Sequence, residues 1–84
     1  MIVQEKPNLL LVDDRHENLL ALEAILNDLD LNLETADSGK AALRCLLKKD
    51  FALILLDVEM PELDGFETAK LIRSRQKNRV AIFL

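Results

Sequence analysis

The feature of this sequence that most constrains its fold is an apolar run that ends in a single carboxylate. The run "LILL", residues 53–56, leads directly into Asp57, and "MPELDG" follows a few residues later. A short continuous apolar run is typical of a strand buried on both faces of a parallel sheet. Pro61 prevents the strand from continuing, because proline lacks a backbone donor. The sequence therefore predicts that Asp57 lies at the end of a buried strand, at the edge of a sheet.

Strands and helices are predicted to alternate along the whole chain. Apolar runs predict the strands, and apolar residues at helical spacing predict the helices. The predicted elements are strand 9–12, helix 16–28, strand 31–36, a helix after Ser38, strand 51–56, a helix after Asp64, and strand 80–84. This alternation favours an α/β fold with one doubly wound parallel sheet, strand order 2-1-3-4, and helices on both faces.

Two of the predicted helices carry capping signals at their N-termini. Ser38 is predicted to be the N-cap of the second helix, and Asp64 is predicted to open the third. Gly65 stands at the entrance of the third helix, where it provides either backbone freedom or close packing. The inner face of that helix is predicted to consist of Phe66, Ala69 and Ile72.

Acidic side chains follow two strands that the predicted order makes neighbours. Asp13 and Asp14 follow the first strand, and Asp57 follows the third. Because the carboxyl ends of parallel strands share one sheet edge, we expect these carboxylates to converge at the switch point. A divalent cation would offset their repulsion, and oxygen ligands without His or Cys favour Mg²⁺, with Mn²⁺ as the alternative. The competing interpretation is that Asp13 and Asp14 only cap a helix.

A carboxylate at a strand end can also act as a nucleophile. Asp57 would form an aspartyl phosphate, while a neighbouring cation screens the anionic phosphoryl group. The segments "LLLVDD" and "DVEMPELDGFE" together resemble the receiver domain of two-component response regulators, which has a flavodoxin-like fold. The resemblance covers residues 9–84, and residues 1–84 are interpreted as one partial receiver domain.

The resemblance implies roles for individual residues. Asp57 would be the phosphoacceptor, with a sensor histidine kinase or a phosphotransfer protein as the donor. Mg²⁺ would be held by Asp14 and Asp57 directly, by Asp13 through water, and by the backbone carbonyl of Glu59. The Glu59 side chain would tune the lifetime of the acyl phosphate. Each chain would take up one phosphoryl group, so a turnover enzyme is not predicted.

The sequence departs from the receiver pattern on its C-terminal side. Receivers carry a Ser or Thr after the fourth strand and a Lys after the fifth, whereas this sequence stops at Leu84. The fifth strand and the last two helices are therefore missing from it. The alternative function is a module that self-associates or binds partners without phosphotransfer. The run "VAIFL" is expected to be an exposed edge strand that favours self-association.

Composition argues against several other functions. The net charge is −4 and the basic residues 70–79 are interpreted as a solvated helix end, so direct nucleic-acid binding is not predicted. No apolar run reaches the roughly 18 residues of a membrane span, and Cys45, predicted to be a small core residue, is the single cysteine. A cytoplasmic protein is predicted. A nucleotide-binding loop would need more glycine, and a haloacid-dehalogenase-type phosphatase would need an Asp where Glu59 stands.

Overall fold

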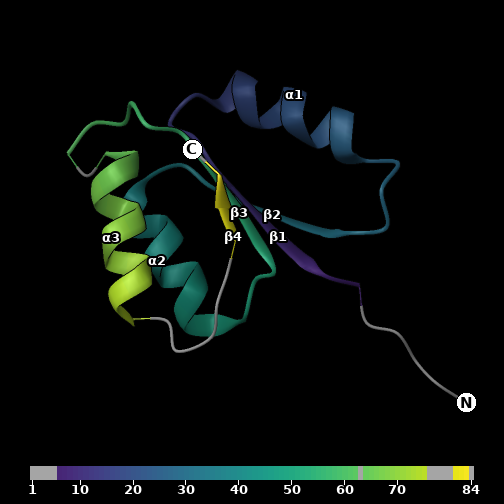
Figure 1. Cartoon of the computed structure of the whole chain (residues 1–84). Helices are drawn as coiled ribbons and strands as arrows, with labels where there is room; N and C mark the ends of the chain where they lie inside the picture. The colour runs from purple at the N-terminus through teal and green to yellow at the C-terminus, as the bar shows by residue number, and fades with distance from the viewer. Residues whose placement is uncertain (1–5, 63, 76–80, 84) are drawn as a thin grey trace, which may run out of the picture.

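The structure, a computed structural model, describes residues 6–62, 64–75 and 81–83. Strands and helices alternate along these residues in the predicted order. The elements are β1 (Asn8–Val12), α1 (His16–Leu26), β2 (Asn32–Ala36), α2 (Gly39–Lys48), β3 (Leu53–Leu56), α3 (Gly65–Arg75) and β4 (Ala81–Phe83). The strands are parallel and lie in the order β2-β1-β3-β4. Helix α1 covers one face of the sheet, and α2 and α3 cover the other (Figure 1). The predicted doubly wound α/β fold is confirmed.

Strand β1 is buried on both faces of the sheet. Its alternate side chains point in opposite directions, and each set packs in a different hydrophobic cluster. Leu10 and Val12 belong to the hydrophobic cluster that includes residues of α2 and α3. Leu9 and Leu11 pack in a second, smaller cluster with Leu19 of α1. These four side chains of β1 are at most 2% exposed. Burial on both faces explains why the strand is a continuous apolar run rather than an alternating one.

The ends of the elements differ from the prediction by one or two residues. Helix α1 ends at Leu26 rather than at residue 28, and β3 begins at Leu53 rather than at residue 51. Strand β4 is described from Ala81 to Phe83, while positions 80 and 84 of the predicted strand lie outside the described residues.

Both predicted N-terminal caps are present. The Ser38 hydroxyl oxygen accepts a hydrogen bond from the backbone N–H of Ala41 at 3.0 Å. Asp64 Oδ1 accepts the backbone N–H of Glu67 at 2.8 Å. Each cap satisfies a donor that the first turn of a helix leaves without a partner, which explains where α2 and α3 begin.

The buried face of α3 differs from the predicted one. Ile72 is fully buried and Ala69 packs against the same cluster, as predicted, but Phe66 is 56% exposed. The prediction for Phe66 was therefore wrong. Thr68 is fully buried instead and donates its hydroxyl to the carbonyl oxygen of Asp64 at 2.7 Å.

The phase of α3 follows from the packing of Gly65. Its N–H donates to the carbonyl oxygen of Val58 at 3.2 Å, and its φ is not positive. A Cβ here would overlap the carbonyl oxygen of Asp57 and lie 2.6 Å from Val58 Cα. Close packing, and not backbone freedom, therefore explains the glycine. With Gly65 against this loop, positions 68, 69 and 72 face the sheet, and Phe66, about 100° further round the helix, faces solvent.

The outer surface carries polar and apolar side chains. Ile25 of α1 is 72% exposed on this surface. Of the basic residues 70–79, Lys70 and Arg73 are exposed on α3, whereas residues 76–80 lie outside the described part.

Cys45 is partly buried against the core, as predicted. Burial is the main cause that raises the pKa of its thiol, and the negative charge of Glu34 is the second. Among the described residues no helix is both long and apolar enough to cross a bilayer.

Replacing Gly65 with alanine is expected to destabilise the fold by about 1–3 kcal/mol, because the added methyl group must displace the backbone at Asp57. Urea unfolding followed by circular dichroism measures the change. Lys70→Ala, at an exposed position of the same helix, is the matched control and is expected to stay within about 0.5 kcal/mol of the wild type. A Gly65→Ala protein as stable as the wild type would contradict the packing explanation.

Candidate metal centre

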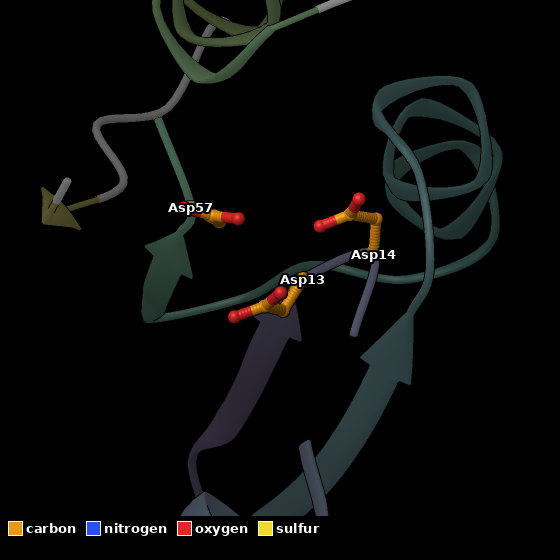
Figure 2. A group of neighbouring side chains, drawn as sticks. All are labelled: Asp13, Asp14 and Asp57. Carbon is orange, nitrogen blue, oxygen red and sulfur yellow. The ribbon is translucent and has the colours of Figure 1, made fainter. Parts of the chain in front are cut away.

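Three acidic side chains meet where β1 and β3 end. Asp13 and Asp14 follow β1 directly, and Asp57 follows β3. One carboxylate oxygen from each residue lies within 4.8 Å of the other two. Figure 2 shows the carboxylates of Asp14 and Asp57 pointing toward each other, with Asp13 beside them at the end of its strand. The convergence predicted from the strand order is confirmed.

Backbone hydrogen bonds of the sheet position two of these acids. The N–H of Asp57 donates to the carbonyl oxygen of Val12 at 2.9 Å, which continues the register of β3 against β1. The N–H of Asp13 donates to the carbonyl oxygen of Ala36 at 3.1 Å, at the end of β2. Since β1 is paired with both β2 and β3, the Cα atoms that carry the carboxylates have fixed positions.

Asp13 is buried, with 8% of its surface exposed, and both of its carboxylate oxygens accept hydrogen bonds. Oδ1 accepts the backbone N–H of Arg15 at 2.9 Å, and Oδ2 accepts the Asn18 side-chain amide at 3.0 Å. The N-cap of α1 is Arg15, and this helix start has no side-chain cap hydrogen bond, so the interpretation of Asp13 as a helix cap was wrong. Asp13 instead accepts the N–H of Arg15 in the turn before the helix and belongs to the acidic cluster. Sequence reasoning missed Asn18. The signal that points to it is an amide in the first helical turn after an acidic pair.

The other two acids are more accessible than Asp13. Asp14 is exposed, and Asp57 is partly exposed. Asp57 Oδ1 accepts the backbone N–H of Glu59 at 3.2 Å. Glu59, predicted to be a ligand through its carbonyl, is itself exposed and touches the cluster through this N–H. Its role as a metal ligand stays a prediction.

The donor set of this cluster fits a hard divalent cation. Its members are all carboxylates, without a His or Cys, among the residues the structure describes. Oxygen donors of this kind suit Mg²⁺ or Mn²⁺ rather than zinc. Lys6, Lys40 and Lys49 form ion pairs with other acids, so these lysines do not offset the charge of the cluster. A bound cation would relieve the repulsion among the three carboxylates.

An open pocket of about 210 Å³ lies beside the acids. Its lining combines two carboxylates with apolar side chains: Val12, Asp13, Leu22, Leu55, Leu56, Asp57 and Phe83. Its apolar lining comes from both hydrophobic clusters, with Leu22 and Leu55 from the cluster under α1 and Val12 and Leu56 from the cluster on the other face. Asp57 is therefore both anchored by its backbone and accessible to a reactant.

Comparison with known proteins identifies relatives of this chain. The family model of the response regulator receiver domain matches residues 9–84. The sensor histidine kinase GacS of Pseudomonas protegens is 36% identical over 73 residues, which cover 87% of this chain and 8% of that protein. The probable histidine kinase 1 of Oryza sativa subsp. indica is 36% identical over 69 residues, which cover 82% of this chain and 7% of that protein. The chain thus spans less than a tenth of the length of these relatives.

Solved structures share the fold. A response regulator receiver protein from Pseudomonas putida superposes with a TM-score of 0.87 at 26% identity, covering 95% of this chain and 67% of that one. The response regulator TrrA from Thermotoga maritima, in complex with Mg²⁺ and BeF, superposes with a TM-score of 0.79 at 32% identity, covering 84% and 62%. A structure of the histidine kinase ThkA in complex with TrrA superposes with a TM-score of 0.82 at 32% identity, covering 90% of this chain and 65% of that one.

The family match extends over nearly the whole chain, and the parallel sheet and its order agree with the solved relatives. This chain belongs to the response regulator receiver domain family.

Proposed function

We propose that this chain is the phosphoacceptor of a two-component signal transduction system, and that Asp57 receives the phosphoryl group. The observation that carries the proposal is the convergence of Asp13, Asp14 and Asp57, whose carboxylate oxygens lie within 4.8 Å of one another. Membership of the receiver family and the similarity to sensor histidine kinases support it. The structure of TrrA with a histidine kinase supports a phosphohistidine of a kinase or phosphotransfer protein as the donor.

We assign Mg²⁺, with Mn²⁺ as the alternative, to the acidic cluster. Asp14 and Asp57 would be direct ligands, Asp13 would bind through water, and Glu59 would contribute its backbone carbonyl. The bound ion would supply positive charge to the carboxylates and to the anionic phosphoryl group. The complex of TrrA with Mg²⁺ and BeF supports this assignment.

The carboxylate of Asp57 acts as the nucleophile in this proposal. One of its oxygens forms a bond to phosphorus while the bond from phosphorus to the donor's imidazole nitrogen breaks, and that nitrogen keeps the electron pair. The hydrogen bonds to the carbonyl of Val12 and from the N–H of Glu59 orient Asp57 before the reaction. Each chain takes up one phosphoryl group, so the protein is not a turnover enzyme. We place the reaction in the cytoplasm, in keeping with Cys45 as a free thiol.

The outer face of α1 is the surface that we assign to the phosphoryl donor. Leu20 and Ile25 are 53% and 72% exposed, and Ala21 and Ala24 are exposed between them on the same side of the helix. The helix begins just after Asp14, so this apolar stripe runs away from the acidic edge. A helix of the donor protein would bury the stripe while its phosphohistidine reaches Asp57.

Acetyl phosphate with Mg²⁺ is expected to add one phosphoryl group to the wild-type chain, detected by intact-mass measurement. The adduct should be stable in acid and labile in base, as an acyl phosphate is. Asp57→Asn should abolish the addition because it removes the nucleophile, and chelation of Mg²⁺ should suppress it. Asp64→Asn is the matched control and should be phosphorylated, since Asn also caps a helix and Asp64 lies outside the cluster. An unmodified wild-type chain would sink the proposal.

Ile25→Lys is expected to lower the rate of transfer from a phosphorylated histidine kinase about tenfold, because burying an ammonium group in the interface costs binding free energy. The rate with acetyl phosphate should stay unchanged, since that donor needs no docking. Leu47→Lys is the control: Leu47 is 78% exposed on α2, on the opposite face of the sheet. Equal effects of the two variants on kinase-dependent transfer would rule out α1 as the docking surface.

A second candidate is a module that associates without phosphotransfer, and β4 favours it. In the described residues β4 pairs with β3 on one side and lies at the end of the sheet order. Phe83 is 60% exposed and lines the open pocket. An unpaired apolar edge strand favours pairing with another chain. We propose that two copies associate along β4, independently of whether Asp57 is phosphorylated.

Light scattering is expected to show a wild-type mass above that of the monomer at micromolar concentration. Phe83→Lys should shift the protein toward the monomer, because a charge at the edge opposes strand pairing. Phe66→Lys is the matched control, since Phe66 is 56% exposed on α3, away from the edge. A folded wild-type monomer at these concentrations would refute the association.

A further inference from the structure

Of the two described hydrogen bonds to Asp13, the one from Asn18 comes from a side chain, and a substitution can remove it without changing the backbone. The amide nitrogen of Asn18 donates to Asp13 Oδ2 at 3.0 Å from the first turn of α1. The other donor to Asp13 is the backbone N–H of Arg15, which any non-proline residue would offer. The orientation of the Asp13 carboxylate therefore depends on the choice of Asn at position 18.

The chemistry of the Asn18 amide suits a carboxylate that must remain available to a cation. An ionised carboxylate has about four lone-pair sites, and the two hydrogen bonds use two of them. An amide is neutral, so it fixes the carboxylate without offsetting its charge, whereas a Lys or Arg would compete with a cation for it. Asp14 shows the contrast, since it is exposed and no described residue is seen to hydrogen-bond its carboxylate.

We propose that Asn18 is a positioning residue of the acidic cluster, which holds the buried Asp13 carboxylate in the orientation that a divalent cation requires. This inference rests on the proposed function, because it assumes that the cluster binds Mg²⁺. Partners that orient a metal ligand typically contribute ten- to a hundredfold to affinity. Asn18 does not touch the reacting atoms in this role and acts through Asp13 alone.

Calorimetric titration of the full chain with Mg²⁺ tests the proposal. Asn18→Ala is expected to weaken Mg²⁺ binding about tenfold, while stability without Mg²⁺, followed by circular dichroism, changes little because Asn18 is exposed and Ala favours the helix. Asn27→Ala is the matched control, the same exchange at the C-terminal end of α1, and should bind Mg²⁺ as the wild type does. Asn18→Leu removes the hydrogen-bond donor while the side chain keeps nearly the same shape, and it should weaken Mg²⁺ binding as Asn18→Ala does. With two variants, the proposal can still be tested if one of them fails to fold.

The outcomes separate this inference from the function on which it rests. A wild-type chain that binds no Mg²⁺ overturns the proposed function and this inference with it. A wild-type chain that binds Mg²⁺, together with a folded Asn18 variant of equal affinity, overturns only the role of Asn18. If an Asn18 variant is less stable without Mg²⁺ but binds Mg²⁺ with the wild-type affinity, Asn18 only stabilises the start of α1. That result too would overturn the proposal.

Discussion

The pairing of β1 on both of its edges is the constraint on which the site depends. The register that sets Val12 against Leu56 continues into the hydrogen bond from Asp57 N to Val12 O. A slip of one residue in that register would turn Asp57 to the other face of the sheet. Burial of β1 on both faces opposes such a slip, because every displaced side chain would leave a packed position. The apolar strands thus position the acids, although no apolar residue belongs to the acidic cluster.

Placing three carboxylates so close together lowers the stability of the fold, because like charges repel. Carboxylates at such separations repel by about 1 kcal/mol per pair in water and about 4 kcal/mol near a protein surface. The exposure of Asp14 favours the lower figure. A domain of this size has a stability of only about 5–15 kcal/mol, so the repulsion is a sizeable fraction of it. A cation bound by the folded state alone would stabilise the fold by mass action, which couples the stability of the domain to the occupation of the site.

Periodicity and topology rules were sufficient for the strand order and for the meeting of the three acids, because both follow from the alternation of elements. They failed where a single contact sets the geometry. Phe66 was assigned to the core by counting apolar positions, whereas the packing of Gly65 on the Asp57 backbone sets the phase of α3. Asn18 was missed because its role depends on a side-chain hydrogen bond to Asp13, and a polar residue in a first helical turn leaves no periodic signal.

The two faces of the sheet differ in how much apolar surface they bury. The face under α2 and α3 holds the larger cluster, from Leu10 to Ile72, together with Met60 from the loop after Asp57. The face under α1 holds a smaller cluster, and the outer surface of α1 carries the exposed stripe of Leu20 and Ile25. Because α1 begins with the donors to Asp13, a partner that binds its outer face touches the same helix that orients the acidic cluster. If the proposed function holds, helix α1 would link recognition of the donor to the geometry of the acidic cluster, while the larger cluster on the opposite face holds the strand ends in position.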